Sequence, residues 1–305
     1  MFKDITFPHS LSFIITLALF GSFEVASKPL MPWFDPVVFN FYRFLLGISV
    51  LILILFWQNR FHELFQIPVN AWVMLVCAGF INVFFAMSLL QIAVKYSNAA
   101  TAATVFCCHP LFVYLLAVFF QHESHEWLKV SGLFTGLIGT VLVMFEKGLR
   151  VNHGALYALL AALAFALYTI LNRFLSGMVK PLVINIVSFF FGLLFLMIYI
   201  VIQGKSLHIP LEFFNSPLRF LTGLYIGIII SGFGYIAFIR TIHIDGAVAA
   251  SLVFLLKPLV VTFLSMLLLH EQLGWYYPIG LVFILTGTAM VLKDRILEKF
   301  SDKAD

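Results

Sequence analysis

Long runs of apolar residues, separated by short polar breaks, dominate the hydrophobic pattern of the chain. A helix needs about 20 mostly apolar residues to cross the hydrocarbon core of a bilayer. These runs are continuously apolar, whereas the strands of a membrane β-barrel alternate between apolar and polar positions. The pattern therefore predicts an all-α membrane protein with ten transmembrane helices, at about residues 11–28, 36–57, 70–93, 98–120, 127–146, 154–174, 181–203, 218–240, 246–269 and 274–292.

Composition narrows the class of protein further. Hydrophobic residues make up 62% of the 305 residues and charged residues only 10%, whereas a soluble domain carries about 25% charged residues. A soluble enzyme, a disordered chain and a secreted disulfide scaffold are therefore excluded. The three cysteines, Cys77, Cys107 and Cys108, lie inside apolar runs, and the net charge of +4 is too small and scattered to indicate nucleic-acid binding.

The distribution of Lys and Arg predicts the orientation of the chain, because cytoplasmic loops carry an excess of these residues. If the chain crosses the membrane ten times, ten Lys and Arg residues lie on the same side as both termini, and six lie on the other side. We therefore expect a multi-pass protein of the cell membrane (inner or plasma membrane) with both termini in the cytoplasm. No A-x-A site follows the first run, which argues against a cleavable signal peptide. The ten are Lys3, Arg60, Lys129, Arg173, Lys180, Arg240, Lys293, Arg295, Lys299 and Lys303, and the six are Lys28, Lys95, Lys147, Arg150, Lys205 and Arg219.

The second half of the chain repeats the first. Residues 98–143 align without gaps on 246–291 at an offset of 148, and a second block aligns at an offset of 145. A shared apolar bias would match leucines, but it would not match proline, His-Glu, tryptophan and glycine in one register. The matched pairs include Pro110/Pro258, His122/His270, Glu123/Glu271, Trp127/Trp275, Gly139/Gly287, Pro36/Pro181 and Asn40/Asn185.

Two five-helix halves follow from this repeat, residues 1–148 and residues 149–305, the second with a short cytoplasmic tail. Because five is an odd number, the second half must cross the membrane in the opposite orientation to the first. Inverted repeats around a site near the bilayer midplane are a recurring architecture of secondary transporters. The repeat therefore indicates transport more strongly than any single residue does.

The chain resembles the drug/metabolite transporter superfamily, EamA type, over nearly its whole length. The resemblance rests on FGSFEVASK (20–28), NFYRFLLG (40–47), the alanine-rich starts of the fourth and ninth helices before Pro110 and Pro258, and the HE…W…G…G pattern in both halves. It implies transport of a small solute, often export of amino acids or other metabolites, with no bound cofactor and no ATPase. It also implies that the fifth and tenth helices are peripheral to a central cavity.

Lys257 and His109 are the first candidates for contact with the solute. Each is an ionisable residue near the middle of a predicted span, and each directly precedes a proline. Such a residue normally faces the interior of the bundle, and the proline frees a backbone carbonyl that can line a cavity. The alternative is a packing kink with the polar group snorkelling to the interface. We expect both side chains to line the cavity.

Residues that break the symmetry of the repeat are the better candidates for binding the solute. Glu24 corresponds to Thr169, His109 to Lys257, Gln91 to Ile239 and Met87 to Tyr235. Other polar residues of the spans add hydrogen-bonding capacity. The predicted solute-binding set is Lys257, His109, Gln91, Tyr96, Tyr168, Asn172 and Tyr235.

Glu24 and Lys28 are the candidates for coupling transport to protons. They lie four residues apart on the first helix, in the favourable order for an ion pair. Glu24 is the only acidic residue well inside any predicted span. A carboxylate that is desolvated in one state and stabilised by water or Lys28 in the other would change protonation during transport. The alternative is a permanent pair on the helix surface.

Several other residues are predicted to be structural. Asn40 and Asn185 occupy the same place in both halves, which favours hydrogen bonds between helices. The arginine at the position of Arg43 recurs in the family across different substrates, so it is assigned to the scaffold. The kinks at Pro110 and Pro258 are also assigned to the scaffold.

The His-Glu dipeptides at Glu123 and Glu271 do not match the H-E-x-x-H zinc motif, and the second copy lacks a further histidine. We expect no metal site there, and interpret both glutamates as turn caps before the fifth and tenth helices.

Gly132, Gly136 and Gly139 give the fifth helix a face of small residues. Close packing inside the bundle is the favoured interpretation of this face, and a homodimer contact is the alternative.

The sequence thus predicts a secondary transporter, not an enzyme, that moves a small amino-acid-like metabolite across the bilayer by alternating access, with export as the expected direction. An exchanger of anionic or nucleotide-sugar-like solutes is the alternative within this class. An intramembrane enzyme is disfavoured because the spans hold no paired catalytic carboxylates, and a membrane scaffold is disfavoured because no soluble domain is predicted. Substrate identity, coupling ion and oligomeric state stay open.

Overall fold

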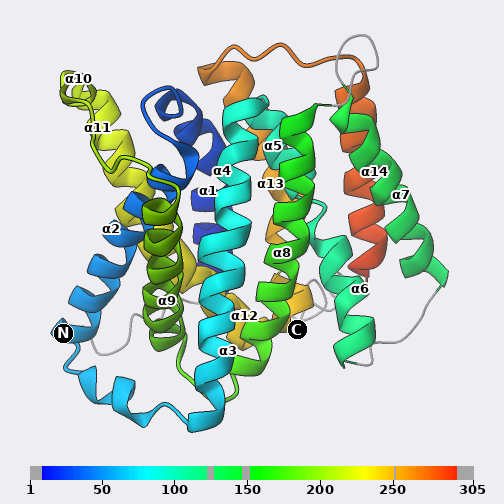
Figure 1. Cartoon of the computed structure of the whole chain (residues 1–305). Coiled ribbons are helices and arrows are strands. Elements are labelled where there is room, and N and C mark those ends of the chain that lie inside the picture. The colour runs from blue at the N-terminus through cyan, green and yellow to red at the C-terminus, as the bar shows by residue number, and fades with distance from the viewer. Residues whose placement is uncertain (1–8, 122–126, 146–151, 251, 294–305) are drawn as a thin grey trace.

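A computed structural model describes residues 9–121, 127–145, 152–250 and 252–293, and every element within these ranges is a helix (Figure 1). The elements of the first half are α1 (His9–Ser27), η1 (Lys28–Leu30), α2 (Pro36–Trp57), η2 (Phe61–Gln66), α3 (Val69–Gly79), η3 (Phe80–Ala86), α4 (Met87–Tyr96), α5 (Ala99–Phe106), α6 (His109–Gln121) and α7 (Trp127–Met144). Those of the second half are α8 (His153–Leu175), α9 (Pro181–Ile202), α10 (Leu211–Phe214), α11 (Pro217–Leu224), η4 (Tyr225–Gly234), α12 (Tyr235–Ala250), α13 (Val253–Leu268) and α14 (Tyr276–Val291).

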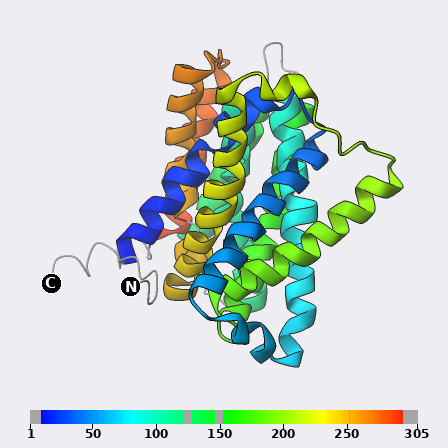
Figure 2. The ribbon, with the colours of Figure 1, turned by 90° about the vertical axis from the view of Figure 1, so that its left-hand side faces the viewer.

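Ten apolar helical segments cross the molecule, which confirms the predicted number of transmembrane helices. Eight of them are helices of membrane-spanning length and hydropathy within the described residues, and the last two, α13 and α14, are shorter apolar helices. The start of α1 and the end of α14 lie at the same end of the molecule (Figures 1 and 2). An even number of crossings requires this arrangement.

The packing of the two halves follows the inverted repeat. The chain comes very close to its neighbour at Gly47 in α2, where an added Cβ would lie 3.1 Å from Ser231 Cβ in η4. The equivalent glycine of the second half, Gly192 in α9, meets Val83 of η3 in the same way, at 2.3 Å. Since Val83 and Ser231 are themselves 148 positions apart, each half inserts its second span against the third span of the other half.

The fifth and tenth spans, α7 and α14, lie side by side at one edge of the bundle (Figure 1). Their backbones approach closely at the predicted glycine face: a Cβ added at Gly132 would lie 2.7 Å from Gly287 O, and one at Gly139 would lie 2.6 Å from Gly280 O. The small-residue face therefore packs within the chain, and a homodimer would have to use another surface.

Helical irregularities occur at matched places in the two halves. The third span contains the π-helical segment η3, and the eighth contains the π-helical segment η4 at equivalent positions. The fourth span is broken between α5 and α6, just before Pro110, whereas Pro258 lies inside α13. The proline ring removes a backbone donor at each place. Between the eighth and ninth spans, Gly246 turns the chain with a φ of 85° inside the segment assigned as α12.

Candidate functional site

A buried ion pair joins the two halves near the centre of the bundle. Lys257 Nζ on α13 donates a hydrogen bond of 2.6 Å to Glu24 Oε1 on α1, and the two side chains are 2% and 0% exposed. The other carboxylate oxygen, Glu24 Oε2, has no hydrogen-bond partner among the described residues. A charge inside the membrane is costly and normally pairs with another. The sequence predicts functional roles for both Glu24 and Lys257, but it does not predict that the two side chains form an ion pair with each other.

Glu24 and Lys28, which the sequence placed four residues apart as a possible ion pair, bind different partners in this structure. Lys28 Nζ instead donates hydrogen bonds to Val94 O at 2.8 Å and to Ser97 O at 2.5 Å, at the end of α4. The last carbonyls of a helix have no partners within the helix and carry partial negative charge. They bind the ammonium group of Lys28, which leaves Glu24 to Lys257.

The His109 side chain contacts Thr169, and this contact is the repeat equivalent of the Lys257–Glu24 ion pair. His109 Nε2 lies 3.0 Å from Thr169 Oγ1, and the Thr169 hydroxyl donates to Phe165 O at 2.8 Å. His109 is therefore the donor to Thr169. His109 and Thr169 are the repeat equivalents of Lys257 and Glu24. The same contact between the two halves therefore occurs twice, once as this hydrogen bond and once as an ion pair.

Aromatic rings surround both contacts. The Lys257 ammonium lies 5.1 Å from the centre of the Phe106 ring, and the His109 ring lies 4.4 Å from that of Phe254. Phe106 and Phe254 are equivalent positions of the repeat. A ring face attracts a cation, more strongly where water is excluded. The rings thus stabilise a cation at the centre while keeping the surroundings apolar.

A small cavity lies beside the ion pair, with a volume of about 20 Å³. Its wall is mostly apolar, and its polar lining residues are Arg43, Tyr235 and Lys257. Lys257 thus lines the cavity as expected, whereas His109 does not, because its ring packs against Phe254 and bonds to Thr169. A volume of this size holds about one water molecule, whereas small-molecule sites occupy about 300–1,000 Å³. A metabolite can therefore enter the centre only when the helices around it move apart.

The sequence assigned Arg43 to the scaffold, but the structure places it in the wall of this cavity. The guanidinium lies over the rings of Phe23 and Phe44, at 4.2 and 4.5 Å from their centres. Two of its nitrogens, Nε and Nη1, have no hydrogen-bond partner among the described residues. The signal was present in the repeat, because the equivalent residue of the second half is Ser188.

Arg43 also lines a second, larger cavity of about 220 Å³. This cavity lies between α2 and the α10–α11 segment, with Phe34, Tyr42 and Phe213 among its aromatic lining residues. Arg43 is thus shared by the two cavities, and it separates the centre of the bundle from a space large enough for part of a small solute.

The other predicted solute-binding residues are distributed unevenly. Tyr235 lines the central cavity, and its hydroxyl donates to Asn82 Oδ1 at 3.3 Å. Gln91 is buried, and neither of its amide atoms has a partner in the described part of the chain. Tyr168 and Asn172 are buried on α8, where Asn172 Nδ2 donates to Tyr168 O. Tyr96 is 64% exposed at the end of α4 and does not line the cavity.

The two matched asparagines behave differently. Asn40 Nδ2 donates to Val83 O at 2.7 Å and to Ser88 Oγ at 3.1 Å, and so ties α2 to the third span. The side chain of Asn185 is buried, and within the described ranges it has no hydrogen-bond partner. The predicted bond between helices therefore occurs in the first half and is not seen in the second.

Glu271 caps a helix, but not the helix that the sequence indicated. Its carboxylate accepts hydrogen bonds from Ala99 N at 2.6 Å and from Ala100 N at 3.0 Å, at the start of α5 in the other half. No side-chain cap bond is present at the start of α14. The expected cap on the tenth helix is therefore wrong, because the unpaired N–H groups of α5 lie within reach of Glu271. Glu123 lies outside the described residues.

Within the described ranges, no group of three or more His, Cys, Asp or Glu side chains lies close enough together to hold a metal ion. The polar chemistry of the centre therefore consists of one carboxylate, two cations and hydrogen-bonding groups.

Comparison with known proteins agrees with this architecture. The chain is 32% identical over 286 residues to an uncharacterized transporter of Clostridium kluyveri, covering 90% of each chain. It is 27% identical over 161 residues to an S-adenosylmethionine uptake transporter of Rickettsia felis, covering 53% of each. A crystal structure 18% identical in sequence has a TM-score of 0.65 and covers 95% of this chain and 98% of its own, which shows a shared fold.

The family assignment covers both halves. The EamA-like transporter family matches the chain over residues 9–145 and again over residues 152–293. These two matches together span nearly the whole sequence, and the fold and the full-length relative agree with them. The chain belongs to the EamA-like transporter family, a group of multi-pass membrane proteins that carry small solutes.

Proposed function

We propose that this transporter exports an amino-acid-like solute by alternating access, with the solute bound between Glu24, Lys257 and Arg43. The observation that carries the proposal is the convergence of these three charged side chains from α1, α13 and α2 on one buried centre. Buried charges inside a membrane bundle are expensive, and they mark solute or ion pathways. The charges therefore serve a ligand better than they serve packing.

The charges match the two ends of an amino acid. A solute carboxylate would bind Arg43, whose Nε and Nη1 have no partner in the described part of the chain. A solute ammonium group would bind Glu24 through its unpartnered Oε2. Charge-assisted hydrogen bonds of this kind are about twice as strong as neutral ones. Such a solute would supply hydrogen-bond partners for these side-chain atoms of Arg43 and Glu24.

The two halves, 1–148 and 149–305, provide the two states that alternating access needs. Because they are related by an inverted repeat, an arrangement open to one side has a counterpart open to the other. The π-helical segments η3 and η4 occur at equivalent positions, next to the cavity residues Met87 and Tyr235. Short π-helical stretches are frequent at functional sites, and they are natural places for the third and eighth spans to bend.

We further infer that both termini lie in the cytoplasm and that the membrane is the cell membrane. The support is the ten-to-six distribution of Lys and Arg and the even number of spans. A cysteine introduced at Ser206, in the loop after α9, should react with an impermeant thiol reagent added outside intact cells. A cysteine at Ser301 should not react. Labelling of Ser301→Cys without Ser206→Cys would reverse the orientation.

The most direct test of the function is transport by the purified protein in proteoliposomes. Vesicles loaded with single amino acids should release at least one of them faster than protein-free vesicles, and Lys257→Met should abolish the difference. Release that is unchanged by Lys257→Met would remove the central site from the pathway. Comparing cells with and without the protein for metabolites in the medium gives the direction.

An exchanger of anionic or phosphorylated solutes is the second candidate. The observation that favours it is the excess of positive charge, since Arg43 and Lys257 face a single carboxylate. Vesicles loaded with inorganic phosphate would then take up labelled phosphate by exchange, and amino acids would not compete.

The Rickettsia relatives add one further solute to test. Several are named S-adenosylmethionine uptake transporters, but they align with only 30–53% of this chain. S-adenosylmethionine carries the ammonium and carboxylate groups of an amino acid, so it would fit the same three charges. It belongs in the same release assay as the amino acids.

A further inference from the structure

A second charged site lies at the end of the molecule where α1 begins and α14 ends. A pocket of about 290 Å³ is formed where α2 ends, α9 begins and α12 passes beside them. Its lining includes the basic residues Arg60, Lys180, Arg240 and His243. None of the described residues that line it is acidic. This pocket does not involve the central ion pair.

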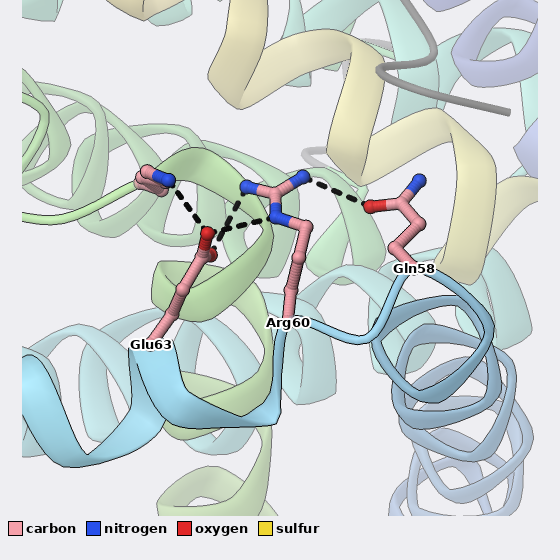
Figure 3. A network of polar contacts seen from close by, with 4 residues as sticks. Gln58, Arg60 and Glu63 are labelled. Carbon is pink, nitrogen blue, oxygen red and sulfur yellow. Dashed lines mark hydrogen bonds and ion pairs between the residues drawn. The ribbon is translucent and has the colours of Figure 1, made fainter.

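One acidic side chain from outside the lining holds two of these cations in place. Arg60 Nε donates to Glu63 Oε1 at 2.8 Å, and Lys180 Nζ donates to the same oxygen at 2.6 Å. Arg60 also donates to Gln58 Oε1 at 2.9 Å, so Arg60 lies between Gln58 and Glu63 (Figure 3). A single carboxylate thus orders two cations at the edge of the pocket and neutralises only one of them.

The inverted repeat shows what the pocket lacks. At the equivalent place at the opposite end of the molecule, Lys205 of the second half forms an ion pair of 2.5 Å with Asp35 of the first. Asp35 also caps α2, since it accepts a hydrogen bond from Val37 N at 2.9 Å. The repeat equivalents of Lys205 and Asp35 are Arg60 and Lys180, which are both cations.

The start of α9 is therefore electrostatically incomplete. Lys180 occupies its cap position, and no side chain caps the helix. Helix N-termini carry partial positive charge and favour anions. The positive charge of Lys180 therefore adds to the partial positive charge at the start of α9. An anion in the pocket would fill the place that the Asp35 carboxylate fills in the other half.

The other lining residues indicate which kind of anion fits. Ile54 and Ile236 line the pocket together with the basic residues. Ile54 precedes the end of the second span, and Trp57, which ends α2, is 80% exposed. Tryptophan is enriched at the level of the lipid headgroups. The basic part of the pocket thus lies beside the headgroup region, with apolar wall next to it.

We propose that this pocket binds an anionic phospholipid, with its phosphate against Arg60, Lys180 and Arg240 and an acyl chain along Ile54 and Ile236. Basic pockets between transmembrane helices on the cytoplasmic side bind lipid headgroups in this way. A free phosphate would leave the apolar wall uncovered. Because α2 comes from the first half and α9 and α12 from the second, the lipid joins the two halves.

The test is lipid retention by the purified full-length protein, measured by native mass spectrometry after exchange into detergent with added lipid. Phosphatidylglycerol should be retained over phosphatidylcholine of the same acyl chains. Arg240→Gln and Lys180→Asn should each weaken its retention about fivefold, in line with about 1 kcal/mol per basic residue near a membrane surface. Lys180→Asn places a favourable cap residue on α9, so it removes the cation while keeping the start of this helix capped.

Lys205→Gln is the matched control, because it removes the repeat-equivalent cation of Arg60 at the opposite end of the molecule. It should leave retention of phosphatidylglycerol unchanged. Equal retention of both lipids, or an equal loss in Lys205→Gln, would overturn the proposal. So would displacement of phosphatidylglycerol by millimolar inorganic phosphate, which would make the pocket a site for free anions.

Discussion

The Glu24 carboxylate accepts its hydrogen bond from Lys257, a residue of the other half of the chain, at 2.6 Å. The repeat equivalents of this pair, Thr169 and His109, are also in contact, at 3.0 Å. The inverted repeat has thus preserved a contact between the first helix of each half and the Pro-containing helix of the other. The chemistry of that contact differs between its two copies, since one is an ion pair and the other is a hydrogen bond between His109 and Thr169.

The ion pair predicts a specific pattern of stability. Glu24→Gln and Lys257→Met should each lower the free energy of unfolding, by about 3–5 kcal/mol, because each leaves one buried charge without its partner. The double variant should lose less than the sum of the two, since it removes both members of the pair together. Thermal unfolding of the detergent-solubilised proteins measures this coupling. Additive losses would show that the two groups do not interact in solution.

Arg43 is expected to bind the solute rather than to support the fold. Replacing it by serine, the equivalent residue of the second half, should lower kcat/KM for transport about 10–100-fold. A hydrogen bond to a charged group contributes about 1.5–3 kcal/mol, which corresponds to this range. The assay is solute release from proteoliposomes, with protein recovery measured in parallel.

Tyr96→Phe serves as the control for Arg43, because Tyr96 lies outside the central cavity. Its transport should match that of the wild type. Normal transport in Arg43→Ser, or poor recovery of that variant with normal activity per molecule, would return Arg43 to the scaffold.

The contact between α7 and α14 predicts the effect of adding single methyl groups. A Cβ at Gly287 would lie 2.4 Å from Gly136 N, so Gly287→Ala forces the two backbones apart. Overpacking of this kind costs about 1–3 kcal/mol, which should appear as a lower unfolding temperature. Gly274→Ala, where nothing lies within 4 Å of the added carbon, should leave it unchanged. Equal unfolding temperatures for the two variants would contradict the close packing.

Glu63 predicts how stability depends on pH outside the membrane spans. Burial by itself raises the pKa of this carboxyl, but hydrogen bonds from Arg60 and Lys180 outweigh it and lower the pKa below its ordinary value of 4.5. A group whose pKa is depressed by folding contributes stability above its unfolded pKa and loses it as the pH falls through the folded pKa. The unfolding temperature should therefore fall below pH 4.5, and Glu63→Gln should reduce that fall. An identical fall in both proteins would assign it to other carboxyls.

The helices and the repeat could be predicted because both follow from the order of residue types along the chain, without knowledge of how the helices pack. A run of about 20 apolar residues has few alternatives to a membrane helix, and matched prolines and glycines fixed the register of the repeat. Partners were harder to predict. Glu24 and Lys28 are neighbours on one helix, but Lys28 is bound by the free carbonyls at the end of α4. That competition depends on how α1 packs against the third span.

The roles of Arg43 and Glu271 were missed for two different reasons. Arg43 was assigned to the scaffold on family resemblance, although its difference from Ser188 marked it as a residue that breaks the symmetry of the repeat. Glu271 was read as a cap on the nearest helix in sequence, but it caps α5, which starts 172 residues earlier. Only the packing of the two halves brings Glu271 to the start of α5 and Arg43 to the wall of the central cavity.

The central proposal is that the solute binds at Glu24, and the sequence further predicts that this carboxyl group couples transport to protons. The measurement is transport by Glu24→Gln in proteoliposomes, with and without a pH gradient. A neutral amide keeps the shape of the carboxyl group but cannot take up a proton. The variant should therefore still exchange labelled solute for unlabelled solute, at higher solute concentrations because the solute's ammonium group loses its charged partner, while losing the accumulation that a pH gradient drives in the wild type. A Glu24→Gln protein that accumulates solute in response to the gradient would contradict the account.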